Sequence, residues 1–137
     1  MEGTMPSSTR TRLVISILCV AFLSTNTIAE GRWKVLGSRK VNHTVDHDTI
    51  PVTAVRGDFR RIRIRVSNVA VDFHRVVVHY ANGGDDTIPM AMRIPAGGYS
   101  RVIDLRGSDR VIRSVDFWYD TRGLAGRHGV VTLYGQE

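Results

Sequence analysis

A period-two alternation in residues 60–67 constrains the fold more than any other feature of this chain. The sequence RRIRIRVS places Ile62, Ile64 and Val66 at alternate positions with arginines between them. Side chains two residues apart on a strand point to the same face, so the segment predicts a strand with one apolar and one basic face. Residues 30–137 contain no run of ten or more residues with apolar positions at helical spacing. An all-β fold is therefore expected.

Short runs rich in β-branched or aromatic residues predict the strands. They cover 32–36, 49–55, 60–67, 69–80, 87–94, 99–105, 111–119 and 128–134. Turns rich in glycine, asparagine and aspartate separate them, and Asn82-Gly83 is a strong hairpin signal. About eight strands at intervals near ten residues favour a single-domain β-sandwich of antiparallel strands over a small barrel.

The pattern also predicts where some strands lie in their sheets. Residues 76–78 are three valines in a row, so both faces of that strand are apolar and a central position is expected. Pro51 and Pro89 lack a backbone N–H donor, which favours edge or strand-start positions for their segments. In 111–119, Asp116 and Trp118 share the face opposite the apolar one.

The first 29 residues have the pattern of a secretory signal peptide. Arg10 and Arg12 precede the uncharged apolar run 13–23, and Thr27 and Ala29 suit the small-residue positions before a cleavage site. The apolar run is shorter than the roughly 20 residues that a membrane-spanning helix needs. We therefore predict cleavage after Ala29 and a periplasmic or secreted bacterial domain over 30–137, without stable membrane insertion. An uncleaved anchor is the alternative.

Cysteine content and charge limit the function classes. The only cysteine, Cys19, lies in the predicted signal peptide, so the mature chain has no thiol for a disulfide, a thiolate metal site or a nucleophile. Nineteen basic and 13 acidic residues give the full chain a net charge of +6. A basic exported protein attracts anionic partners such as lipid headgroups, acidic polysaccharides or nucleic acid.

The basic face of the predicted strand 60–67 is a candidate site for an anionic envelope or extracellular polymer. Arg61, Arg63 and Arg65 share it, and guanidinium groups bind carboxylate, sulfate and phosphate bidentately. A solvated strand face explains the same pattern and is the more common case. Nucleic acid is not expected, because aromatics are not interleaved with the arginines and only Trp118 is predicted to be exposed elsewhere. Asp116 would neutralise the patch if it lay alongside. Three arginines would extend it from neighbouring strands: Arg75, Arg101 and Arg113.

The segment VNHTVDHD supplies a second candidate, a metal site. His43, Asp46, His47 and Asp48 carry the imidazole and carboxylate ligands that remain when thiolates are absent. Such a site would belong to a metal-binding protein or a metal-dependent hydrolase. On an extended strand His43 and His47 would lie about 13 Å apart, so a tight loop would be needed to bring them to one ion. The alternative is a polar connection in which aspartates organise turns.

Catalytic motifs are not apparent. The chain has no G-x-S-x-G elbow, no phosphate-cradling loop and no histidine-glutamate metal motif. Asp85 and Asp86 follow the glycine turn at 82–84 and are interpreted as solvated turn residues rather than calcium ligands. We therefore predict a non-catalytic binding or interaction module without a cofactor.

Three stretches resemble a known family. WKVLG at 33–37, PAGGYSRVIDLRGSDRVIRSVDFWY at 95–119 and VVTLYG at 130–135 are similar to the YaaI family of small exported bacterial proteins of unknown function. The resemblance implies export and a compact β-rich domain, and it carries over no site residue. This chain lacks the cysteine pair of that family's pattern in the mature part, so a role that depends on such a disulfide is not carried over.

Overall fold

The computed structural model describes residues 3, 31–42, 46–53, 57–107, 110–120 and 126–137. These residues form strands and connecting turns, and none of them is helical. The described ranges accordingly contain no helix of the length and apolarity required to cross a membrane.

Nine strands lie within the described residues. They are β1 (Lys34–Val41), β2 (His47–Pro51), β3 (Asp58–Phe59), β4 (Arg61–Ser67), β5 (Val71–Tyr80), β6 (Asp85–Ile94), β7 (Ile103–Asp104), β8 (Arg110–Asp120) and β9 (Gly129–Gln136).

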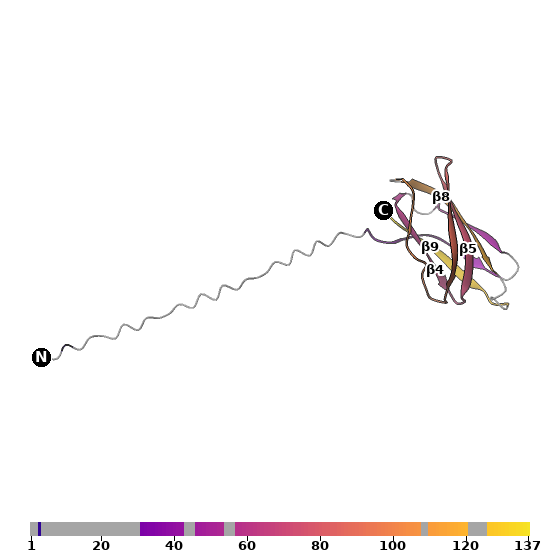
Figure 1. The fold of residues 1–137 in the computed structure, drawn as a ribbon, viewed down its shortest axis with the longest axis horizontal. Coiled ribbons are helices and arrows are strands. Elements are labelled where there is room, and N and C mark those ends of the chain that lie inside the picture. The colour runs from indigo at the N-terminus through magenta and orange to yellow at the C-terminus, as the bar shows by residue number, and fades with distance from the viewer. Residues whose placement is uncertain (1–2, 4–30, 43–45, 54–56, 108–109, 121–125) are drawn as a thin grey trace.

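The strands form two antiparallel sheets that pack as a sandwich (Figure 1). The first, sheet A, has the order β1-β9-β4-β7. The second, sheet B, has the order β2-β8-β5-β6, with β3 paired to β8. The prediction of an all-β sandwich is confirmed.

The core lies between the inner faces of the two sheets. Ile62, Ile64 and Val66 of β4 are buried, as the alternation predicted. Phe73 of β5 and Phe117 of β8 pack in sheet B with ring centroids 5.9 Å apart. Because both sheets direct their apolar positions inward, the alternate positions on each strand form two solvent-facing surfaces.

Strand positions within sheet B follow the sequence predictions. Pro51 lies on β2 and Pro89 on β6, and these are the two edges of the main path of that sheet. The strand that contains residues 76–78 is β5, which lies between β8 and β6. The β5–β6 hairpin turns at Gly83, which has a φ of 88°. The side-chain oxygen of Asn82 accepts a hydrogen bond from Gly84 N at 2.9 Å.

The predicted strand at 99–105 is largely wrong. Tyr99 forms only an isolated bridge to Arg65, and regular pairing is confined to the two residues of β7. The hydroxyl of Ser100 accepts the hydrogen bond of Ile64 N at 2.9 Å, so a side chain replaces a ladder carbonyl here. The segment runs beside β4 as a loop and exposes 45% of the Tyr99 side chain.

The beginning of the described domain is tied to its end. The amide of Gln136 donates a hydrogen bond to Gly31 O, and Lys34 Nζ lies 2.8 Å from a carboxylate oxygen of Glu137. β1 pairs with β9 from Lys34 onward. These contacts fix Trp33, which comes directly before β1, against sheet A.

Candidate functional site

The arginines of β4 lie on the outer face of sheet A, as predicted, but their neighbours differ from those expected. β4 pairs with β9 and β7. β5 and β8 belong to sheet B, so Arg75 and Arg113 do not extend the patch and Asp116 does not neutralise it. The guanidinium of Arg101 donates to Pro89 O on β6.

Arg61 is neutralised by a partner that was not predicted. Its Nε atom lies 3.1 Å from an oxygen of Asp104 on β7. Because β7 is the edge of sheet A next to β4, the basic face carries no net charge at that edge.

Arg63 lies among three aromatic rings. The central carbon of its guanidinium is 4.4 Å from the centroid of Trp33, 4.3 Å from that of Tyr99 and 5.7 Å from that of Tyr134. Tyr99 and Tyr134 also contact each other, with centroids 5.9 Å apart. We call Arg63 with these three rings the Arg63 cage. The prediction that Trp118 is the exposed aromatic of the chain is wrong, because Tyr99 is exposed beside the arginines.

The cage holds the guanidinium in a defined orientation. The Nε atoms of Arg63 and Arg65 are buried and have no hydrogen-bond partner among the described residues. Neither arginine forms an ion pair with a described carboxylate. Arg65 also lies near Tyr99, at 5.7 Å. Cation–π contact restrains both half-buried side chains, and neither has a carboxylate partner among the described residues, so two arginine forks are pre-organised for an anion.

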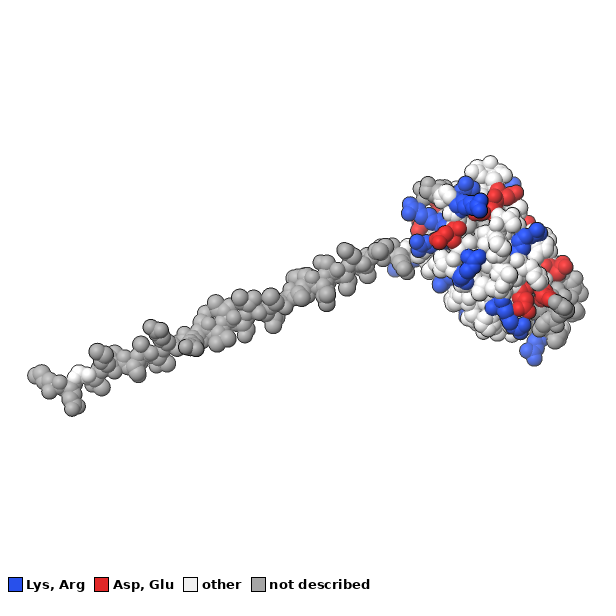
Figure 2. Space-filling model, in the orientation of Figure 1, with Lys and Arg blue, Asp and Glu red and all other residues white. Residues whose placement is uncertain are grey.

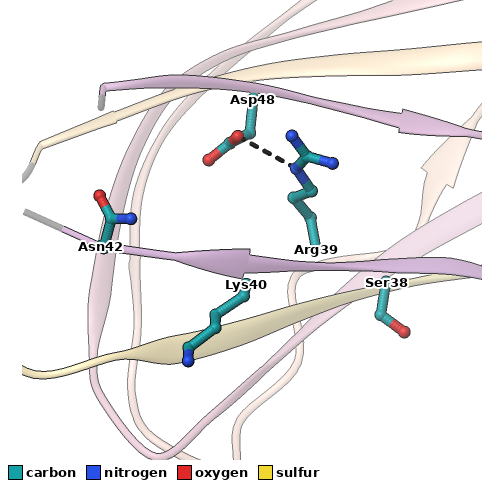
Figure 3. Close-up of a pocket in the computed structure, with 5 residues that line it drawn as sticks. All are labelled: Ser38, Arg39, Lys40, Asn42 and Asp48. Carbon is teal, nitrogen blue, oxygen red and sulfur yellow. Dashed lines mark hydrogen bonds and ion pairs between the residues drawn. The ribbon is translucent and has the colours of Figure 1, made fainter. Parts of the chain in front are cut away.

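A pocket of about 390 Å³ lies at the β1 edge of the sandwich, near β2. Ser38, Arg39, Lys40, Asn42 and Asp48 line it (Figure 3). Figure 3 shows Arg39 directed at Asp48, and its Nε atom is 3.2 Å from a carboxylate oxygen. Ser38 and Lys40 project from the other side of β1. The lining thus has two cations and one carboxylate.

The candidate metal residues do not converge where the structure describes them. His43 lies outside the described residues. His47 stacks on Trp118 on the outer face of sheet B, with centroids 4.3 Å apart. Its neighbour Asp48 is directed inward and accepts a hydrogen bond from the hydroxyl of Tyr119 at 2.8 Å. Burial and this carboxylate raise the pKa of Tyr119.

Asp46 is placed by its main chain, because its carbonyl accepts the hydrogen bond of Tyr119 N at 2.9 Å. Within the described ranges, no group of three or more His, Cys, Asp or Glu side chains is arranged to hold a metal ion.

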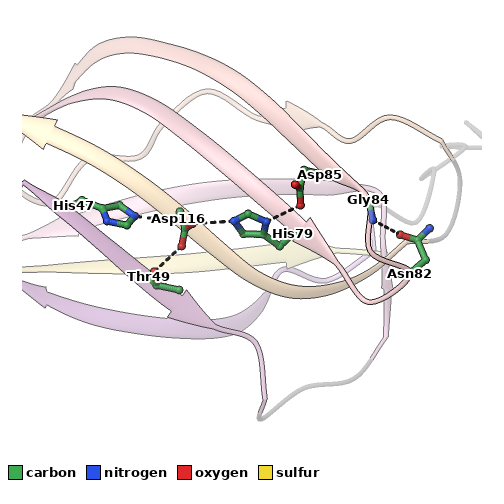
Figure 4. Close-up of polar contacts among 7 residues, drawn as sticks. All are labelled: His47, Thr49, His79, Asn82, Gly84, Asp85 and Asp116. Carbon is green, nitrogen blue, oxygen red and sulfur yellow. Dashed lines mark hydrogen bonds and ion pairs between the residues drawn. The ribbon is translucent and has the colours of Figure 1, made fainter.

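A row of polar side chains crosses the outer face of sheet B (Figure 4). His79 on β5 contacts Asp85 on β6 through Nδ1 at 2.6 Å and Asp116 on β8 through Nε2 at 2.8 Å. Thr49 on β2 donates to the other oxygen of Asp116. His47 approaches Asp116 from the opposite side, at 3.9 Å.

The two carboxylates stabilise the imidazolium form of His79. Its hydrogen bonds to Asp116 and then to Asp85 raise its pKa above the ordinary value. Burial alone would raise the pKa of Asp116, but the hydrogen bonds from Thr49 and His79 lower it. Both ring nitrogens of His79 are occupied by carboxylates, so the imidazole has no open nitrogen with which to act as a base.

Of the two aspartates after the glycine turn, Asp85 is exposed as expected, whereas Asp86 is buried, which corrects the interpretation from sequence for Asp86. Asp85 contacts His79, and Asp86 is only 7% exposed. A carboxylate oxygen of Asp86 accepts hydrogen bonds from the hydroxyl of Tyr80 at 3.4 Å and from Arg106 N at 3.3 Å. Burial and the nearby carboxylate raise the pKa of Tyr80 to about 12.

Charge by itself does not mark a site. Figure 2 shows basic side chains interspersed with acidic and uncharged ones over the face in view. The arrangement of individual cations therefore distinguishes the surfaces. Among the described residues, Arg75 on sheet B lies over a single ring, that of Trp118, whereas the Arg63 cage combines two arginines without a carboxylate partner with three rings.

Comparisons with known proteins place the chain in a family and support the fold. The sequence profile of DUF2541, a domain of unknown function, matches residues 13–135. None of the curated proteins matches the chain.

Two solved structures match the chain, and the first of them supports the fold. One is from a structural and functional characterization of Pseudomonas aeruginosa AlgX, with 18% identity and a TM-score of 0.52. That match covers 76% of this chain and 26% of the AlgX chain, so this chain spans about a quarter of AlgX. The other is a mutant of a family 29 carbohydrate-binding module complexed with cellulohexaose, with 10% identity and a TM-score of 0.42. That match covers 79% of this chain and 92% of the module.

Proposed function

We propose that this chain, which belongs to the DUF2541 family, is a non-catalytic binding module that binds an anionic polysaccharide on the outer face of sheet A. The observation that carries the proposal is the Arg63 cage. An arginine without a carboxylate partner is held between Trp33 and Tyr99, next to a second such arginine, Arg65. Ordering two guanidinium groups before the ligand arrives lowers the entropic cost of binding.

The geometry of the cage favours a sugar polymer. Rings at 4.4 and 4.3 Å flank the guanidinium of Arg63, so an anion reaches it at the edge formed by the terminal nitrogens. A carboxylate or sulfate substituent fits such an edge through two parallel hydrogen bonds. Tyr99 offers exposed aromatic surface beside that edge, on which the apolar C–H face of a sugar ring can pack.

Nucleic acid fits the same surface less well. Binding of single strands depends on aromatic faces that are open for stacking with successive bases. In the cage, the guanidinium of Arg63 already lies over the rings of Trp33 and Tyr99. The surface therefore offers fewer open ring faces than a base-stacking platform needs.

The absence of catalysis is part of the proposal. A non-catalytic module needs no activated nucleophile, and His79 is held between two carboxylates rather than next to a nucleophile. The polar row on sheet B is explained as a link between four strands.

The proposal also includes export. Residues 1–29 are proposed to be a signal peptide that is removed in the periplasmic or secreted protein, on the grounds of the apolar run and its small-residue exit. The intact mass of the exported chain tests this directly. A chain that begins at or within a few residues of Glu30 is expected, and an exported chain that retains residues 13–23 would contradict cleavage.

Retention on immobilised heparin and polygalacturonate tests the binding face. A charge-assisted hydrogen bond contributes about 1.5–3 kcal/mol, so the double variant Arg63→Ala/Arg65→Ala should weaken binding at least roughly tenfold. Arg113→Ala is the matched control, because it removes an exposed arginine from sheet B. Thermal unfolding of each variant reports whether it is folded.

Three outcomes would overturn the assignment. If the double variant and Arg113→Ala lose the same retention per positive charge removed, the polysaccharide is attracted by net charge alone. Unchanged retention of the double variant would show that Arg63 and Arg65 on the outer face of sheet A do not bind the polysaccharide. Tighter binding of single-stranded DNA than of either polysaccharide would replace the proposed ligand class.

A further inference from the structure

We propose that the polysaccharide crosses the strands of sheet A, from the Arg63 cage over β9 to the pocket at the β1 edge, which is a second subsite for an anionic sugar. This inference rests on the proposed function and adds a direction and a minimum length to the ligand. It follows from the strand register, from the lining of the pocket and from the distribution of charge along the face.

The register places a continuous polar row between the two ends. Arg65 on β4 is the cross-strand partner of Thr132 on β9, and Thr132 is the partner of Ser38 on β1. Directly paired residues of adjacent strands project from the same face. Neighbouring strands lie about 4.8 Å apart, so roughly 10 Å separates Arg65 from Ser38. Two hydroxyl groups therefore connect the caged arginines with a residue that lines the pocket.

The pocket has the charge that an anionic sugar needs. Asp48 offsets the charge of Arg39, and its other carboxylate oxygen accepts the Tyr119 hydroxyl. The side chain of Lys40 forms no hydrogen bond or ion pair with another described residue, so none of these residues offsets its charge there. With about 390 Å³ of space and the hydroxyl of Ser38, the pocket has room for a sugar unit and a donor for it.

The opposite end of the face explains why the path runs toward β1. On the β7 side, Arg61 is already paired with Asp104 at 3.1 Å. On the β1 side, Lys40 is exposed and lies opposite Val130 of β9. Among the described residues that the strand register places on this face, Arg63, Arg65 and Lys40 are cations without a carboxylate partner. They lie in a line that runs obliquely across β4, β9 and β1.

The line implies a dependence on ligand length. Lys40 is two strands away from Arg65 and two residues further along, which corresponds to about 12 Å. A short oligomer can occupy only the cage, whereas a longer one reaches both cationic ends. The second contact then forms within the complex at a high effective concentration, so affinity should rise once the oligomer spans the gap.

The test is calorimetric titration of the mature chain with size-fractionated oligogalacturonates from the dimer upward, at physiological ionic strength. In the wild type, affinity should increase by roughly tenfold over the length that bridges Arg65 and Lys40, as expected for one added charged contact. The variant Lys40→Ala should lose this increase and bind the shortest oligomers as the wild type does. Arg113→Ala is the matched control and should retain the increase.

The outcomes separate this inference from the proposed function. If Lys40→Ala weakens all lengths equally, or none, while Arg63→Ala/Arg65→Ala still abolishes binding, the path to the pocket is wrong and the binding face stands. If neither oligogalacturonates nor heparin oligosaccharides of any length bind the wild type, both proposals fail. A length-dependent increase that only Lys40→Ala removes supports the path.

Discussion

Trp33 and Arg63 are predicted to stabilise each other even without a ligand. Their contact distance of 4.4 Å is well within the range of a cation–π interaction. Such an interaction is worth about 0.5–1 kcal/mol at exposed sites and about 2 kcal/mol when desolvated. Arg63 is half-buried with its Nε atom fully shielded, so we expect a coupling free energy of about 1 kcal/mol.

A double-mutant cycle measures this coupling. Trp33→Leu keeps apolar contact without the indole, and Arg63→Met keeps most of the aliphatic stem without the charge. Urea unfolding of the wild type, both single variants and the double variant gives the coupling as the departure from additivity. For a domain of this size, about 1 kcal/mol corresponds to a change of about 4–8 °C in Tm.

A second cycle provides the control. Trp118 lies on the outer face of sheet B, so Trp118→Leu and Arg63→Met should be additive within about 0.5 kcal/mol. If the Trp33–Arg63 coupling is no larger than this control value, the rings do not hold the guanidinium and the argument for pre-organisation fails.

Three further predictions concern other parts of the structure. The folded-state pKa of His79 is above its unfolded value of 6.5, so its contribution of about 1–2 kcal/mol is complete below that pH and is lost as the pH rises through the folded-state pKa. In urea unfolding from pH 5 to 9, His79→Gln should remove this loss and His74→Gln should preserve it, and identical profiles for both variants would refute the assignment. Gly135→Ala would place a Cβ atom 2.7 Å from the Leu36 side chain and should cost about 1–3 kcal/mol of unfolding free energy, so a neutral result in urea would contradict the packing. Asp104→Asn should release a cation on β4 and increase retention on polygalacturonate, whereas reduced retention would contradict the role assigned to that face.

The fold was accessible from the sequence because its physical causes are local. Alternation of side chains records which face of each strand is buried, and this held for Ile62 and its neighbours on β4. The missing donors of Pro51 and Pro89 favoured edge or strand-start positions, and both strands are edges of the path in sheet B. Side-chain alternation and the positions of proline are properties of single strands, so they can be interpreted without knowing which strands are neighbours.

The candidate site was only partly accessible, because it depends on strand order and register. Alternation placed Arg63 on an outer face but did not show which sheet it belonged to, so arginines of sheet B were expected beside it. The rings of the cage come from the residue before β1, a loop and β9, which are far apart in the sequence. The 99–105 segment has strand-like composition, but the Ser100 hydroxyl replaces a ladder carbonyl, and backbone hydrogen bonds to Ile64 and Val66 hold the segment as a loop that brings Tyr99 to the arginine.

β-Bulges are a second reason why side-chain directions cannot be fully predicted from the sequence. Pairing shifts between Phe73 and Arg75 on β5, and Phe73 and Val76 are both buried although they are three positions apart. Strict alternation would have assigned them to opposite faces. Predictions of side-chain direction beyond such a point therefore lose their basis.

The chain contains two tryptophans, and they report on the two outer faces separately. Trp33 belongs to the Arg63 cage on sheet A, and Trp118 lies on sheet B between His47 and Arg75. The most direct test of the binding face is therefore the pair of indole N–H signals in a nitrogen–proton correlation NMR spectrum during titration with an oligogalacturonate. If the oligogalacturonate binds to sheet A, the Trp33 signal shifts in a saturable manner while the Trp118 signal stays in place. Saturable binding that moves only the Trp118 signal would contradict binding to this sheet.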